Sequence, residues 1–140
     1  MITADLKKGT QVSISNGRHT WLADEPVEAD GTDEGPNPYD LLLGALAACT
    51  CITLSLYCRH KNLPLDSINA QFEHERIHTS DCADCEDSKK GYIEQIKGKV
   101  RIKGEFNDAQ RKRLSQIVTR CPVHKTLSND IKFVDDIEFA

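Results

Sequence analysis

Residues 41–58 read LLLGALAACTCITLSLYC and contain no charged side chain. This run falls slightly short of the roughly 20 predominantly apolar residues that a membrane-spanning helix needs, and it includes hydroxyl-bearing residues such as Thr50 and Tyr57. Small residues, among them Gly44 and Ala47, let other parts of a protein approach the backbone closely. The run therefore predicts a long central helix that is buried in protein, with no membrane involved.

Helix-capping and helix-breaking residues bound this expected helix. Asn37 is able to cap its N-terminus, with Pro38 in the first helical position, and Asn62 and Pro64 end it. Residues 26–38, just before the helix, are rich in Gly, Pro, Asp and Glu and have little apolar content. They predict a loop.

The chain before this loop alternates between apolar and hydroxyl-bearing residues, which is typical of half-buried strands. The pair Asn16 and Gly17 is a strong signal for a hairpin turn. We therefore expect a three-stranded β-meander at residues 2–6, 10–16 and 19–23.

The chain after the central helix contains two alternating stretches, separated by a polar hairpin tip. Further on, Asn107 and Gln110 have the spacing of a reciprocal capping box. The expected elements are strands at 65–78 and 92–103, a helix after Asn107, a short helix from Pro122 and a final strand at 131–139. This order of elements implies an α+β fold.

The composition describes a folded globular protein with a modest negative charge. Hydrophobic residues make up 39% of the chain, and 18 basic against 22 acidic residues give a formal net charge of −4. The longest basic block is the triplet at 111–113, which disfavours a protein that binds nucleic acid electrostatically. A chain of 140 residues without repeats predicts a single domain over residues 1–140.

The chain contains six cysteines, and its first eight residues carry no apolar signal region. We therefore expect a cytoplasmic protein in a reducing environment. There, cysteines act as metal ligands, redox groups or core residues rather than as a disulfide framework.

Cys121 lies in the most informative local sequence. Pro122 pushes the backbone of Cys121 out of the helical region and begins a new helical turn, which makes Cys121 an N-cap. Arg120, His124 and Lys125 surround it in the sequence. Helix N-termini and neighbouring cations favour the reactive thiolate form, so we interpret Cys121 as a reactive thiol. The alternative is that it extends the apolar stripe of the preceding helix.

Cys49 and Cys51 belong to the central helix but lie on different faces. Two residues at about 100° each separate them by roughly 200°, so they cannot pair with each other inside a helix. From the sequence alone, we interpret each of them as a small buried apolar residue. A reactive thiol here requires a cation from another part of the fold.

The pair Cys82 and Cys85 lies at the expected hairpin tip, after His74 and His78. Two thiols and two imidazoles make a complete tetrahedral zinc set, but histidines four residues apart on a strand are about 13 Å apart. Three interpretations stay open: a three-ligand zinc site, a labile disulfide between the two thiols, and exposed polar residues without a metal.

Two motifs together resemble the OsmC/Ohr superfamily of osmotically inducible and organic hydroperoxide resistance proteins. They are GTDEGPNPYDLLLGALAACT at residues 31–50 and CPVHKTL at residues 121–127. The order of the expected elements agrees with this family over nearly the whole chain.

The resemblance implies an intertwined homodimer that reduces organic hydroperoxides with thiols and without a cofactor. Cys49 matches the family's peroxide-attacking cysteine and Cys121 its resolving cysteine. Arg18 resembles the arginine that activates the first thiol. In the peroxidase members a glutamate follows the Asn-Pro pair, whereas this chain has Tyr39 there and Asp40 one place later. Asp40 is therefore the candidate acidic partner of Arg18.

The mechanism that the resemblance implies serves oxidative-stress defence. Cys49 would become a sulfenic acid, condense with Cys121 to a disulfide, and be reduced by a small dithiol or a protein thiol. Two alternatives remain. The hairpin extension with Cys82 and Cys85 resembles the branch of redox or disulfide-regulating proteins, and a zinc-binding protein is the other alternative.

Overall fold

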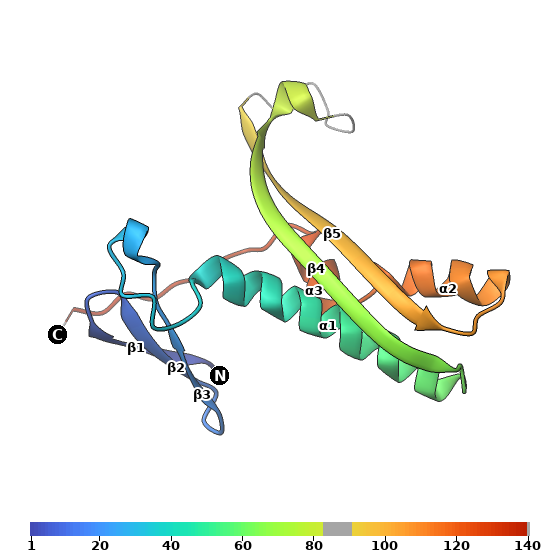
Figure 1. Cartoon of the computed structure of the whole chain (residues 1–140). Coiled ribbons are helices and arrows are strands. Elements are labelled where there is room, and N and C mark those ends of the chain that lie inside the picture. Colours follow the sequence, from blue (N-terminus) through green and yellow to red (C-terminus); the bar gives the residue numbers. More distant parts are fainter. Residues whose placement is uncertain (83–90, 140) are drawn as a thin grey trace. The chain divides into compact units, whose positions relative to one another are not determined.

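The computed structural model describes residues 1–82 and 91–139 (Figure 1). The chain forms two compact units, residues 1–44 and 45–140. Helix α1 (Pro38–His60) begins in the first unit and continues into the second. The predicted order of strands, helix, strands and helices is confirmed as a mixed α+β architecture.

The first unit contains the predicted meander. Strands β1 (Thr3–Lys8), β2 (Gln11–Ser15) and β3 (Thr20–Ala23) form an antiparallel sheet in the order β1-β2-β3. The turn between β2 and β3 is built as the sequence indicates. The side chain of Asn16 accepts hydrogen bonds from the N–H groups of Arg18 and His19 at 2.9 and 2.7 Å, and Gly17 has a φ of 87°.

A buried carboxylate organises the loop that follows β3. Asp24 accepts hydrogen bonds from the hydroxyls of Thr10 and Thr32 at 2.5 and 2.6 Å. It also accepts hydrogen bonds from the backbone N–H groups of Glu25 and Glu34 at 2.8 and 3.1 Å. These bonds, the one from Thr10 foremost, hold the pKa of Asp24 well below its usual range. Sequence analysis assigned no structural role to Asp24.

The substitution Asp24→Asn is expected to destabilise the protein in a pH-dependent way. Because folding lowers the pKa of Asp24, the charged carboxylate stabilises the folded state above pH about 4, the ordinary aspartate range. That contribution is lost as the pH falls further. We expect Asp24→Asn to lower the thermal midpoint by roughly 10 °C at pH 7. The difference in thermal midpoint between the variant and the wild type should become smaller towards pH 3.

Thermal melts followed by circular dichroism between pH 7 and pH 3 measure this gap. Asp33→Asn is the matched control, since Asp33 is exposed and asparagine tolerates its positive φ of 55°. A gap that stays constant across the pH range would contradict the assigned role of the carboxylate.

The second unit contains the hairpin, the larger part of α1, the short 3-10 helix η2 (Thr79–Asp81) and two further helices. Strands β4 (Leu65–His78) and β5 (Tyr92–Gly104) pair antiparallel, and α2 (Asp108–Val118) and α3 (Pro122–Leu127) follow. Both bonds of the predicted capping box between Asn107 and Gln110 are present at 2.9 Å. The core joins α1 to α2 through four buried side chains, Leu54, Cys58, Leu114 and Ile117.

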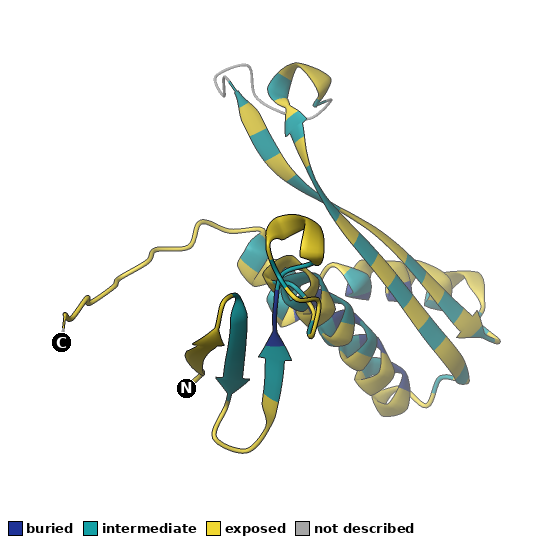
Figure 2. Cartoon of the chain, turned by 60° about the vertical axis from the view of Figure 1, so that its left-hand side comes forward, coloured by how far each residue is buried: buried dark blue, intermediate teal, exposed yellow. Residues whose placement is uncertain are grey.

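Within a single chain, the burial of α1 is confined to one face (Figure 2). The buried residues of α1 form one stripe four residues apart: Leu46, Thr50, Leu54 and Cys58. On another face, Ile52 and Leu56 are exposed by 58% and 48%. By length and composition alone, α1 could cross a membrane. The prediction was a helix buried in protein, and the described residues of this chain cover only one face of it.

The predicted final strand at residues 131–139 is wrong. The segment is exposed and belongs to no strand, and Figure 2 shows it as an extended tail. A strand needs a neighbour to bond its backbone, and in the described residues the two sheets contain only β1 to β5. The alternation of apolar residues in this tail is real, but no strand within residues 1–82 and 91–139 pairs with it.

Candidate functional site

Cys121 is the N-cap of α3, as predicted from the following proline. Its backbone is extended, with φ −62° and ψ 143°, and its Sγ accepts the N–H of His124 at 3.2 Å. The side chain is fully buried. A backbone N–H that points at the sulfur at the start of a helix stabilises negative charge on it.

A second donor reaches the same sulfur from α1. The hydroxyl of Thr50 lies 3.7 Å from Cys121 Sγ, within the range of a hydrogen bond to sulfur. Thr50 is buried and directly follows Cys49 in the chain. The contact joins the start of α3 to α1 at the residue next to Cys49, across 71 positions of sequence. Sequence analysis missed Thr50, whose only signal was its place in the stripe of α1.

Cys49 is a free, half-buried thiol at the margin of that stripe. It lies about 100° around α1 from Thr50, because consecutive helical residues are separated by that angle. The described hydrogen bonds of the Cys121 sulfur join it to Thr50 and His124. Whether Cys49 and Cys121 act on each other stays a prediction.

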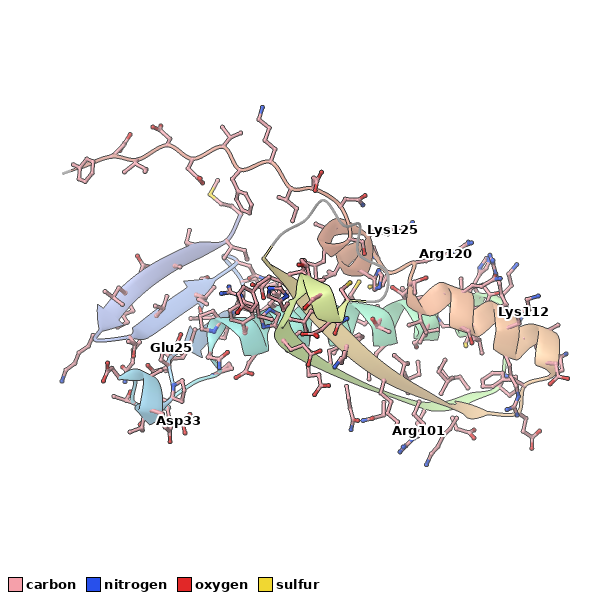
Figure 3. The ribbon with its side chains drawn as sticks, turned by 90° about the horizontal axis from the view of Figure 1, so that it is seen from above. Glu25, Asp33, Arg101, Lys112, Arg120 and Lys125 are labelled. Atoms are coloured by element: carbon pink, nitrogen blue, oxygen red, sulfur yellow. The ribbon has the colours of Figure 1, made fainter. Side chains whose placement is uncertain are left out.

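The cations expected around Cys121 are exposed at the surface. Arg120 and Lys125, labelled in Figure 3 near α3, are both exposed. The groups that bond the sulfur are instead a hydroxyl and a backbone N–H. The hydrogen-bond donors found at the Cys121 sulfur are therefore these two groups, one from α1 and one from α3.

Arg18 and Asp40, the other two candidates, belong to the first unit. Arg18 lies exposed in the turn between β2 and β3. Asp40 caps α1: its carboxylate accepts the N–H of Asn37 at 3.2 Å, and the side chain of Asn37 accepts the N–H of Asp40 at 2.8 Å. The N-cap predicted at Asn37 is confirmed, whereas the reciprocal bond from Asn37 N–H to Asp40 was not predicted. The catalytic roles of Arg18 and Asp40 stay predictions.

Residues 31–134 match the family model described as OsmC-like protein. The chain belongs to the OsmC-like family. The resemblance seen in the sequence motifs is thereby confirmed. Proteins of this family are soluble, and in this member the apolar helix α1 packs one face against α2 and the hairpin.

Similar proteins were found in sequence and in structure. The uncharacterized protein YmaD of Bacillus subtilis is 34% identical over 61 residues, 44% of this chain and 41% of YmaD, so the match spans less than half of that relative. An OsmC-like protein from Mycoplasma pneumoniae superposes with a TM-score of 0.70 and 22% identity, covering 91% of this chain and 86% of that one.

A structure from Legionella pneumophila, described as an organic hydroperoxide resistance protein OsmC and regulator of sulfide bond formation, gives a TM-score of 0.63. Its identity is 18%, and the match covers 91% of this chain and 87% of the other. At these identities the likeness establishes a shared fold. The OsmC-like fold expected from the sequence is confirmed.

The remaining cysteines of this OsmC-like protein fall into three environments. Cys58 is buried in the core, where burial raises the pKa of its thiol and keeps it protonated. Cys51 is free and half-buried beside Ile52 and Leu56. Cys82 is disulfide-bonded, whereas Cys85 lies outside the described residues.

The histidines of the hairpin have partners other than a metal. His74 Nε2 lies 2.5 Å from a carboxylate oxygen of Glu94, and His78 Nδ1 lies 2.7 Å from the hydroxyl of Ser80. The rings of His78 and Tyr92 meet edge to face at 5.3 Å. Within residues 1–82 and 91–139, no three His, Cys, Asp or Glu side chains are grouped to hold a metal ion. The described residues therefore give no support to a zinc site.

Proposed function

We propose that this OsmC-like protein is a cytoplasmic thiol peroxidase that reduces organic hydroperoxides in oxidative-stress defence. The observation that supports the proposal is the contact between Thr50 and Cys121, because Thr50 directly follows Cys49 in α1. Membership of the family, whose solved relatives include organic hydroperoxide resistance proteins, supports the same reaction.

In the first step, the Cys49 thiolate attacks the terminal oxygen of the hydroperoxide. The O–O bond breaks, and the departing alkoxide takes up a proton and leaves as the alcohol. The sulfur retains one oxygen as a sulfenic acid, so the thiol is oxidised by two electrons and the peroxide is reduced by two.

In the second step, Cys121 attacks the sulfenic sulfur of Cys49. A disulfide forms and the oxygen leaves as water. The hydrogen bonds from His124 and Thr50 hold the sulfur of Cys121 in position for this attack. A small dithiol or a protein thiol then returns both cysteines to thiols and is itself oxidised to a disulfide.

Arg18 supplies the positive charge that keeps Cys49 ionised, from its own chain or from a second copy. Asp40 orients the guanidinium in this proposal. A carboxylate offers about four acceptor sites, so the cap that Asp40 makes on Asn37 leaves it able to bind an arginine as well.

The proposed enzyme is a homodimer. The uncovered face of α1, with Ile52 and Leu56, and the exposed tail at 131–139 are apolar surfaces that one chain leaves open to water. A second copy of the chain would bury them, in agreement with the intertwined dimer that the family resemblance implies.

The direct test is mass spectrometry of the reduced protein after one equivalent of cumene hydroperoxide. We expect the intact mass to fall by two hydrogen atoms and peptide mapping to find Cys49 linked to Cys121. Unreacted hydroperoxide together with an unchanged mass would overturn the proposal.

A second candidate is a thiol–disulfide protein whose oxidised form is recognised by another protein. Two features favour it: Cys82 is already disulfide-bonded, and Tyr39 stands where the family's peroxidases carry glutamate. Multiple-turnover kinetics with an alkyl hydroperoxide and excess dithiol separate the two candidates. A peroxidase consumes many equivalents of hydroperoxide per chain, whereas the second candidate consumes about one equivalent per reactive cysteine pair and then stops.

A further inference from the structure

A cavity of about 380 Å³ lies in the second unit, between the β4–β5 hairpin, α1 and the α2–α3 junction. Its volume suits a compact small molecule. Most of its lining side chains are apolar, and they include Leu46, Phe72, Ile96, Val118 and Leu127. The lining also contains polar side chains, among them Glu94 and His124.

The cavity shares two walls with the thiol site. Leu46 lies one helical turn before Thr50 on the buried stripe of α1. His124 lines the cavity, and its backbone N–H bonds the sulfur of Cys121. A molecule in this cavity would therefore lie beside the elements that hold the thiols, without displacing Cys121 from its buried position.

Glu94 supplies the only carboxylate among the described residues that line the cavity. It is held by Arg76, whose Nε lies 2.7 Å from Oε1, and by His74, whose Nε2 lies 2.5 Å from Oε2. The bond from Arg76 foremost, then the one from His74, lowers the pKa of Glu94, so the group is ionised at neutral pH. Arg76 and His74 are not among the residues that line the cavity, so the Glu94 carboxylate is the acidic group at its wall.

We propose that this cavity holds the organic group of the hydroperoxide and that Glu94 selects it by charge. Neutral apolar groups are accepted because the apolar wall gains from burial, and groups that end in a carboxylate are rejected by like-charge repulsion. This inference rests on the proposed function and adds a specificity-determining residue to it.

The test compares cumene hydroperoxide with its para-carboxylate derivative, two substrates that differ by one charge. The wild type is expected to favour the neutral substrate in kcat/KM. Glu94→Gln removes the negative charge and leaves Arg76 and His74 in place, so the preference should shift by about tenfold towards the carboxylate substrate. An unchanged ratio of the two kcat/KM values would overturn the inference.

Glu75→Gln is the matched control. Glu75 lies on β4 next to Arg76, so its side chain points to the opposite face of the hairpin, where it pairs with Lys97 at 2.5 Å. This substitution removes the same charge from the same hairpin, on β4 rather than β5, and the substrate ratio should stay that of the wild type. A shift equal to that of Glu94→Gln would show a general charge effect and would contradict selection at the cavity.

A binding measurement separates this inference from the proposed reaction. Calorimetric titration of the Cys49→Ser protein uses cumyl alcohol and its para-carboxylate derivative, which resemble the reduced products and do not oxidise thiols. If the neutral alcohol binds more tightly and Glu94→Gln reduces the difference about tenfold, the inference stands even where hydroperoxide turnover is absent. If neither alcohol binds, the cavity is closed in solution and the inference fails, whatever the turnover.

A steric substitution locates the bound group. The ring of Phe72 lies over its cross-strand partner Gly98, and a Cβ at position 98 would overlap that ring. Gly98→Ala must therefore displace Phe72 and reshape the cavity wall, and we expect cumyl alcohol to bind at least several-fold more weakly. Gly44→Ala is the control, because a Cβ there meets nothing within 4 Å. Equal affinities in the two variants would place the ligand elsewhere.

Discussion

Replacing Cys49 by serine is expected to lower hydroperoxide turnover by about a thousandfold or more, to the level of the uncatalysed reaction. The proposed reaction begins with a thiolate that attacks the O–O bond, and a serine hydroxyl at that position is neither ionised nor comparably nucleophilic. Consumption of cumene hydroperoxide in the presence of a dithiol measures the loss. The same variant should leave the fold intact, because the Cys49 side chain is only half-buried.

Cys121→Ser is expected to behave differently from Cys49→Ser. Without a resolving thiol, the sulfenic acid on Cys49 should accumulate after one equivalent of hydroperoxide and react with dimedone, which mass spectrometry detects as an adduct on the Cys49 peptide. If Cys49→Ser retains turnover and Cys121→Ser loses it, the attacking thiol is Cys121 and the assigned order of steps is reversed.

Cys51→Ser provides the matched control for both substitutions. Cys51 lies two residues from Cys49 on the same helix, is also free and half-buried, and has no part in the proposed reaction. Turnover in this variant should equal that of the wild type. A comparable loss there would mean that any thiol removed from α1 disturbs the site, and the effect of Cys49→Ser would then carry no mechanistic meaning.

The parts of the fold that sequence predicted correctly are those whose hydrogen bonds are local. Asn107 and Gln110 are three residues apart, and Cys121 is followed at once by the proline that makes it an N-cap. In each case the donor and the acceptor lie within one helical turn, so residue types at fixed spacing are sufficient to predict the bond.

The geometry of the thiol site depends on contacts between residues far apart in the sequence, which no local sequence pattern predicts. Thr50 and Cys121 are 71 residues apart, and a threonine inside an apolar helix gives no sign that its hydroxyl will meet a sulfur. Cys121 was therefore predicted as a capping thiol, whereas the donor that reaches it from α1 was missed. Asp24 was missed for the same reason, since its two hydroxyl partners lie before and after it in separate segments.

The wrong prediction at residues 131–139 has a different origin. Alternation of apolar residues shows that a segment has one face to bury, but it does not say which surface covers that face. In α1 and in the tail, the sequence pattern correctly indicates an apolar face. The surface that would cover this face is not in the described part of this chain. Both observations point to a second molecule.

Light scattering of the purified protein is therefore expected to give twice the chain mass of 15.7 kDa. The exposed stripe of α1 runs through Ala48, Ile52 and Leu56, which are four residues apart and lie on one face of the helix. Large apolar side chains at such positions, together with the small alanine, suit a close helix–helix or helix–sheet contact between copies. Interfaces of stable dimers bury about 800 Å² per partner, and an apolar helix face of this kind is a natural centre for one.

The double substitution Ile52→Glu and Leu56→Glu should break that dimer. Two carboxylates would be forced into an apolar interface without partners, and we expect the dissociation constant to rise by roughly a hundredfold or more. Gln116→Glu adds a negative charge on the exposed surface of α2 and should leave the dimer intact.

If the double variant unfolds, melting of the wild type still tests whether the protein is a dimer. The thermal midpoint of a dimer rises with protein concentration, and that of a monomer does not. A wild-type midpoint independent of concentration, with a mass of one chain, would leave the apolar face of α1 without the partner assigned to it.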